Sequence, residues 1–238
     1  MKTGVILSGL ILSVNLLISC TNIDCIDGSG NQVSLNRKSD PFTKVEVSGS
    51  INLVLKQDTL NSIRVLADDN IQDEIITEVK GDKLSIDMNR GLCDPGNVTV
   101  YLSSVNFEGV EGSGAVGIQS DGKLNVQDFD LDLQGASKVN LDLNVANLRT
   151  SSSGSSEIVL RGQAGTHEIE LTGAGSLDAF DFVVGRYLIN SSGASHSKIN
   201  VINELEVNST GASEVEYKGK PGKILKDNSG ASSLKDVN

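Results

Sequence analysis

Ser192-Gly193-Ala194-Ser195 returns as Thr210-Gly211-Ala212-Ser213 and as Ser229-Gly230-Ala231-Ser232. Related copies stand earlier in the chain around Gly114, Gly135, Gly154 and Gly173. Aligned on the glycine, the successive intervals are 21, 19, 19, 20, 18 and 19 residues. A short motif that returns at a nearly fixed period is the mark of a solenoid, in which each repeat packs only on its neighbours.

The segments between these motifs alternate apolar and polar residues, as in Val139-Asn140-Leu141-Asp142-Leu143. This alternation predicts strands and not helices. A period near 19 with short strands and a glycine turn makes one coil, and successive coils stack about 4.8 Å apart. The sequence therefore predicts an all-β, single-stranded parallel β-helix. The small residue after each glycine, such as Ala194, is expected to point inward at a tight corner.

The part of the chain before the repeats is less regular. Strand patterns at 45–47, 51–55, 84–88 and 98–102 indicate that residues 41–108 form wider first coils of a β-helix domain spanning 41–238, with the regular repeats at 109–238. A separate sandwich domain is the alternative. Asp68-Asp69-Asn70 is a plausible N-cap, which predicts a short helical cap element through about Glu78.

The N-terminus has the pattern of an export signal. Lys2 precedes an apolar run from Val5 to Ile18, and Leu17-Ile18-Ser19-Cys20 resembles a lipobox. We expect residues 1–19 to be a lipoprotein signal peptide, Cys20 to carry lipid, and 20–40 to be a tether. An uncleaved anchor helix is the alternative, but the run is short for a hydrocarbon core about 30 Å thick. Thr21, where the lipoprotein rule places Asp for inner-membrane retention, favours a lipid-anchored protein of the outer membrane.

Two cysteines remain if Cys20 is lipidated. In an oxidising compartment, Cys25 and Cys93 are most simply explained as one disulfide. A reactive or metal-binding pair is the alternative, but no His stands near either cysteine in the sequence.

Three features together resemble a known family. Val45-x-Val47-x-Gly49, Val65-x-Ala67-Asp68-x-Asn70 and the Ser-Gly-Ala-Ser array are similar to the auto-transporter adhesin family with a head GIN domain. The resemblance runs from about Phe42 to Val237. It implies a right-handed parallel β-helix, an exported or lipid-anchored protein of Gram-negative bacteria and an adhesin role, and it carries over no catalytic residue.

The charge and the outward positions suggest possible partners. A net charge of −11 makes nucleic acid an improbable partner, because phosphate binding needs clustered Lys and Arg. Three residues before each glycine lies a polar column that includes Glu111, Asp132 and Glu170. This flank is a candidate surface for a glycan, a surface protein or Ca²⁺. A solvated face is the alternative, since alternating strands produce such a column without any ligand.

The case for an enzyme rests on the same column. Glu111 and Asp132 would stand about 5 Å apart on adjacent coils, near the spacing of a retaining glycosidase pair. The flank lacks the aromatic and basic residues that hold acidic sugars, and His167 and His196 have different offsets from their glycines. We expect His residues on a solenoid flank to be surface residues, and we expect no cofactor. The sequence thus favours a non-catalytic envelope module, an adhesin, glycan-binding protein or spacer, over a carbohydrate-active β-helix.

Overall fold

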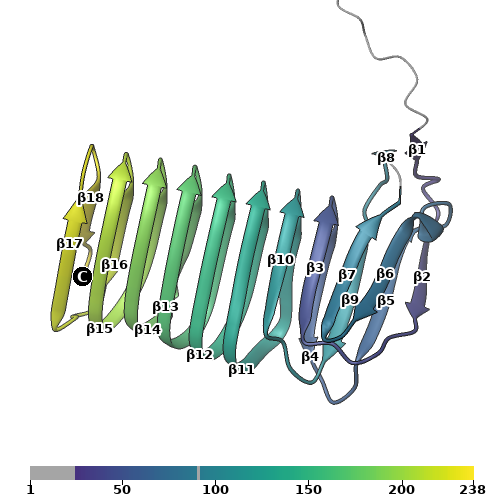
Figure 1. The fold of residues 1–238 in the computed structure, drawn as a ribbon, viewed down its shortest axis with the longest axis horizontal. Helices are drawn as coiled ribbons and strands as arrows, with labels where there is room; N and C mark the ends of the chain where they lie inside the picture. Colours follow the sequence, from purple (N-terminus) through teal and green to yellow (C-terminus); the bar gives the residue numbers. More distant parts are fainter. Residues whose placement is uncertain (1–24, 90–91) are drawn as a thin grey trace, which may run out of the picture.

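The glycine motifs stack on one another along the whole repeat array. The computed structural model describes residues 25–89 and 92–238. In it, parallel strands follow one another along a single axis, from β10 to the C-terminal end (Figure 1). The regular coils consist of β10 (Gly109–Gly114), β11 (Gly117–Gly135), β12 (Lys138–Gly154), β13 (Glu157–Gly173), β14 (Ser176–Gly193) and β15 (His196–Gly211). The predicted solenoid of parallel coils is confirmed.

Each long strand ends at a corner glycine with a positive φ, which lies between 89° and 120° from Gly114 to Gly211. Only glycine adopts this conformation readily. The residue after the corner donates its N–H to the corner glycine of the preceding coil, as in Ala136 N to Gly114 O at 2.8 Å. The corners therefore hold adjacent coils in one register, which sets every outward and inward column.

The inward corner column is one residue later than the sequence suggested. Ala194 and the equivalent alanines are exposed, whereas Ser195, two residues after the glycine, is buried. Ser137, Ser156 and Ser213 occupy the same buried position in other coils. The expectation of an inward alanine column was wrong, because the inward positions keep a two-residue period through the corner, and counting from buried Ser191 through the exposed Gly193 reaches Ser195 and not Ala194.

The core is a continuous column of aliphatic side chains along the axis. Register partners such as Leu131, Thr150, Ile169, Ile189 and Val207 stack coil upon coil and are all buried. Aromatic rings fill wider places, with Phe42 against Phe107 near the N-terminal end, and His167 against Phe182 and Tyr187 in the middle.

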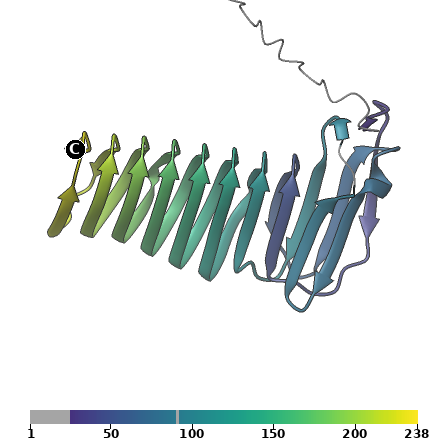
Figure 2. The same cartoon turned by 45° about the horizontal axis from the view of Figure 1, so that its top comes forward.

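The N-terminal end has mixed topology. Parallel pairs join β3 (Lys44–Gly49) to β10 and β4 (Asn52–Gln57) to β11, so the stack continues into this region. Figure 2 shows this end as a broader group of strands beyond the regular coils. Its further strands are β1 (Ile26–Asp27), β2 (Gln32–Arg37), β5 (Ser62–Asp68), β6 (Ile75–Lys80), β7 (Lys83–Met88), β8 (Leu92–Asp94) and β9 (Thr99–Ser104). Antiparallel pairs link β2 with β5, β5 with β9, and β6 with β7.

The predicted helix at the N-terminal end does not form. Only a 3-10 turn, η1 (Gln72–Glu74), follows Asp68, and its preceding residue Ile71 makes no side-chain cap. The chain continues directly into β6, where Ile75, Thr77 and Val79 supply the β-branched residues that favour a strand. Pairing of β6 with β7 outweighs the local capping pattern, so the prediction of a helix through Glu78 was wrong.

The disulfide fastens the N-terminal segment to this region. Cys25 and Cys93 are bonded, with their Cα atoms 5.3 Å apart. Gly28 N donates to Asp94 O at 2.7 Å, and Gly30 N donates to the buried Asp68 carboxylate at 2.7 Å. Strands β1 and β2 lie within the stretch predicted as a tether. The predicted signal peptide at 1–19 and Cys20 lie outside the described residues.

The last coil is the C-terminal end of the stack. It contains β17 (Lys223–Asn228), which pairs with β15, and β18 (Ser233–Asp236), which pairs with β16 (Glu214–Lys218). Ile224 and Leu225 are exposed there, and Lys226 follows Val207 in the inward column. This coil is thus less covered than those before it.

Candidate functional site

Two outward surfaces flank the glycine corners. We call the outward residues of the strand segment that precedes each corner the acidic face, which includes Glu111, Asp132 and Glu170. We call the outward residues of the segment that follows each corner the amide face, which includes Asn52, Gln119 and Asn140. Both faces are formed by columns of side chains in register.

The three residues predicted as a binding flank do lie in one column. Glu111 pairs with Asp132, Asp132 pairs with Ser151, and Ser151 pairs with Glu170. The column continues on one side to Glu46, which pairs with Glu111. Glu111 and Asp132 are therefore direct neighbours, while Glu170 is separated from them by a serine.

A lysine enters the acidic column near its N-terminal end. Lys83 Nζ lies 2.8 Å from Glu111 Oε1 and 3.5 Å from Glu46 Oε2. The hydrogen bond with Glu111 is the main reason that the pKa of Lys83 is raised. The Lys83 ammonium thus lies between the carboxylates of Glu46 and Glu111 at this end of the column.

The hollows on the acidic face are small. One of about 200 Å³ lies beside Glu111 and Asp132, and another of about 330 Å³ lies beside Glu170, Asn190 and Asn208. Among the residues that the structure describes, no group of three or more His, Cys, Asp or Glu side chains is placed to hold a metal ion. The acidic face therefore displays hydroxyls, amides and carboxylates along a nearly flat surface.

The two histidines lie in different environments, one buried and one at the surface. His167 is buried in the core, and burial lowers its pKa to about 3. Its Nε2 lies 2.9 Å from Thr150 Oγ1, so the neutral ring serves packing. The expectation of a surface position was wrong for His167 but is met by His196, whose Nδ1 lies 3.4 Å from Glu214 Oε2.

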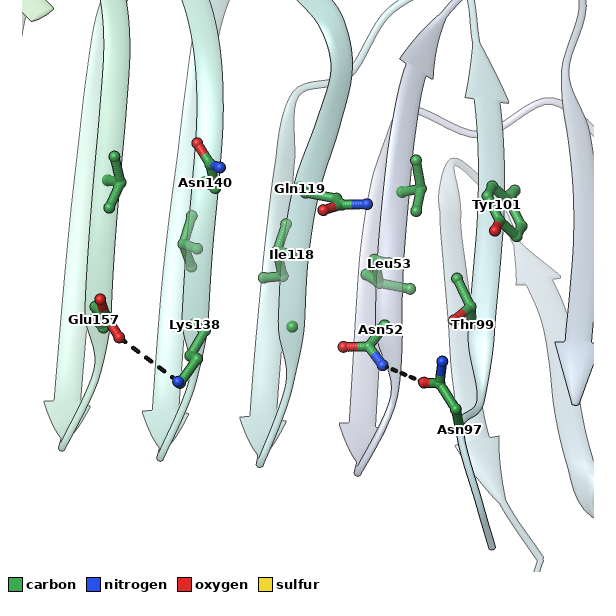
Figure 3. Close-up of a pocket in the computed structure, with 14 residues that line it drawn as sticks. Asn52, Leu53, Asn97, Thr99, Tyr101, Ile118, Gln119, Lys138, Asn140 and Glu157 are labelled. Carbon is green, nitrogen blue, oxygen red and sulfur yellow. Dashed lines mark hydrogen bonds and ion pairs between the residues drawn. The ribbon is translucent and has the colours of Figure 1, made fainter. Parts of the chain in front are cut away.

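A larger hollow than the two on the acidic face lies on the amide face, where the sequence pattern had predicted no site. It has a volume of about 530 Å³, and we call it the Gly117 hollow after one of its lining residues. Figure 3 shows the side chains that line it. It spans five parallel segments, from β9 through β4, β11 and β12 to β13. Its side chains include Asn52, Asn97, Tyr101, Gln119, Lys138, Asn140 and Glu157.

The local sequence explains why this surface is hollowed. The outward column Thr99, Asn52, Gly117, Lys138, Glu157 lacks a side chain at its central position. Asn97 lies just before β9 and forms one end wall, where it accepts a hydrogen bond from Asn52 Nδ2 at 2.9 Å (Figure 3). Lys138 and Glu157, 3.8 Å apart, form the other end.

The second column supplies the remaining wall. Its order is Tyr101, Val54, Gln119, Asn140 and Val159. The Arg64 guanidinium lies 3.8 Å from the centre of the Tyr101 ring, which fixes the ring at one end of the hollow. Arg161 Nη1 donates to Asn140 Oδ1 at 2.5 Å. The hollow thus combines amide groups, one aromatic ring and a paired positive and negative charge.

The sequence did contain one indication of the residues that line this hollow. Asn140 and Gln119 are the polar members of alternating strands, and Gly117 replaces a residue in an outward column. What the sequence did not show was the pairing of β4 with β11, which brings Asn52 beside Gly117.

Within the described part of the chain, no helix reaches the length and hydropathy of a membrane span.

Comparisons with known proteins agree with this architecture. A family model described as "Putative auto-transporter adhesin, head GIN domain" matches residues 41–221. A search of curated proteins gives no match.

Solved structures share the fold at low sequence identity. A putative adhesin from Bacteroides fragilis has a TM-score of 0.85 and 19% identity, covering 89% of this chain and 100% of its own. A putative adhesin from Parabacteroides merdae has a TM-score of 0.70 and 19% identity, with 90% and 100% covered. A structure named as a putative lipid binding protein, from Parabacteroides distasonis, has a TM-score of 0.73 and 21% identity, with 90% and 99% covered.

Proposed function

Because the chain belongs to the family described as putative auto-transporter adhesins with a head GIN domain, we propose that it is a non-catalytic adhesin module of the cell envelope. In this proposal, lipid on Cys20 holds the protein at the outer membrane, and the solenoid presents its outer columns to a glycan or a surface protein. Fold alone does not assign a function, so the support comes from the surface.

One observation carries the proposal: polar outward side chains run in unbroken register across successive coils. On the acidic face, Glu111, Asp132, Ser151, Glu170, Asn190 and Asn208 form one such column. A repeated display suits many weak contacts made at once, because linked binding events gain strength through effective concentration.

The arrangement offers less support for catalysis. An enzyme needs an acid, a base or a nucleophile positioned in a site that restricts water. Glu111 is paired with Lys83, and His167 is buried in the core. The carbohydrate-active alternative would have to use Asp132 on an open surface.

Cation-assisted binding is the less favoured form of the proposal. Lys83 already neutralises the part of the column where Glu46 and Glu111 meet, and a divalent cation would have to displace it. Ca²⁺ normally takes six to eight oxygen ligands, and the described residues offer no such cage.

The test uses the full chain expressed in a Gram-negative host. Cells that carry the protein should be retained on a mucin-coated surface more strongly than cells with an empty vector. The Cys20→Ala variant should leave the membrane fraction and lose retention. Retention equal to the vector control would refute the adhesin role, and a Cys20→Ala variant that still partitions with membranes would refute the lipid anchor.

A further inference from the structure

The Gly117 hollow differs from the hollows on the acidic face in volume and chemistry. We propose that it is a binding subsite for an uncharged sugar unit of a glycan chain. The inference rests on the adhesin function proposed above and names the ligand class for one site.

The dimensions fit a small ligand. The volume of about 530 Å³ falls within the range of small-molecule sites, about 300–1,000 Å³. Asn52 and Lys138 stand on either side of Gly117 in the same column. Two strand spacings separate them, about 10 Å, and Gly117 contributes no side chain between them, although the Asn52 amide leans over the glycine.

The polar groups favour a ligand rich in hydroxyls. Gln119 presents an amide with both a donor and an acceptor, while Asn52 and Asn97, which are bonded to each other through Asn52 Nδ2 and Asn97 Oδ1, present the Asn52 oxygen and the Asn97 nitrogen. Sugar hydroxyls also donate and accept, so adjacent hydroxyls can match an amide on both counts. Tyr101 adds a ring at one end with a phenolic hydroxyl that can do the same.

The charges argue against an anionic ligand. Lys138 is paired with Glu157 across 3.8 Å. Arg64 stacks on Tyr101, and Arg161 donates to Asn140. Lys138 and Glu157 are the only charged side chains among the lining residues, so the lining carries no net charge that would attract an acidic sugar.

The strand pairing at Gly117 and the apolar side chains of the hollow argue against a peptide strand or a lipid as the ligand. Gly117 pairs with Asn52 on one side and with Lys138 on the other, so no free strand edge is available for an added strand. The outward apolar side chains are Val54 and Val159, which cannot enclose an acyl chain.

The experiment fills the hollow without disturbing the core. Gly117 has no positive φ, and a Cβ there would meet only the flexible side chain and the Cα of Asn52. Gly117→Gln therefore places a side chain in the hollow, and Asn52→Ala removes an amide from its wall. Ser176→Gln is the matched control, because Ser176 follows Glu157 in the same column but does not line the hollow.

Full-length protein and its variants are probed on an array of neutral, sialylated and sulfated oligosaccharides, with thermal melting to confirm folding. We expect the parent to bind neutral glycans. Gly117→Gln and Asn52→Ala should weaken that binding by about tenfold or more, and Ser176→Gln should match the parent. Binding restricted to acidic glycans, neutral binding that survives Gly117→Gln, or no neutral binding at all would overturn the proposal.

The two proposals fail separately. If cells with the parent and cells with Gly117→Gln adhere to mucin equally, the sugar subsite is refuted and the adhesin role stands. If the parent does not adhere, the adhesin role is refuted whatever the array shows.

Discussion

Gly173 stacks directly on Gly154 of the preceding coil, and a Cβ at Gly173 would lie 2.5 Å from the Gly154 carbonyl oxygen. The φ of Gly173 is 112°, so a side chain there meets both backbone strain and a backbone clash. We predict that Gly173→Ala lowers the free energy of unfolding by at least about 1–3 kcal/mol, measured by urea denaturation. Gly122→Ala is the control, since Gly122 has a φ of 88° and open space around its Cβ position. Equal losses of unfolding free energy in the two variants would show that the close stacking of the corner glycines does not add to the cost of the side chain.

The corner register gives a second prediction. Ser195 is buried and hydrogen-bonds Ser213 at 3.2 Å, whereas Ala194 beside it is exposed. Ser195→Leu should overpack the corner and lower stability by about 1–3 kcal/mol, while Ala194→Leu should change it little. A larger loss in Ala194→Leu than in Ser195→Leu would contradict the inward serine column.

The third prediction concerns acid stability. The pKa of His167 is about 3 in the folded chain because the ring is buried, against about 6.5 when exposed. The unfolded state therefore takes up a proton first as pH falls below 6.5. The stability that neutral His167 contributes is fully present above that pH and falls by about 1.4 kcal/mol per pH unit toward pH 3.

The test compares melting temperatures of the parent and His167→Leu between pH 7 and pH 5, where few carboxylates titrate. Leu148 occupies the same column one coil earlier, so leucine suits the site. The variant should lose much of the pH dependence, and the His196→Gln control should keep it. If the melting temperature of His167→Leu changes with pH as steeply as that of the parent, His167 is not the cause of the pH dependence.

The last coil gives a fourth prediction. Lys226 stands in the inward column beyond the buried Val207, and an inward charge at an exposed sheet edge discourages pairing with other strands. Lys226→Val should increase self-association in sedimentation velocity, because it extends the exposed apolar surface of Ile224 on the same side of β17. Lys220→Val, outside the strands, should behave like the parent. Equal self-association of the Lys226→Val and Lys220→Val variants would show that Lys226 does not limit self-association.

The coil architecture could be predicted because it depends on local features, the corner glycines and the alternation between them. The inward corner residue was misplaced by one position, at Ala194 in place of Ser195, although the two-residue period of buried Ile189, Ser191 and Ser197 passes through Ser195. The helix expected through Glu78 failed because pairing between β6 and β7 outweighed a local cap. The right-handed winding remains a prediction.

The polar column of Glu111, Asp132 and Glu170 was predictable, since equal offsets from the corner place these residues in one register. The Gly117 hollow was not, because its walls come from segments that are distant in the sequence. Asn52 and Asn97 reach Gly117 only through the pairing of β4 with β9 and β11. Nothing in the local sequence of Gly117 reports those partners.

We propose that the solenoid binds glycans without cutting them. The most direct measurement incubates the protein with a panel of polysaccharides and records both retention on each polymer and the release of new reducing or unsaturated ends. The account predicts retention on at least one neutral polymer and no release of new ends. Release of new ends by the parent that disappears in Asp132→Asn would contradict it and establish a carbohydrate-active enzyme.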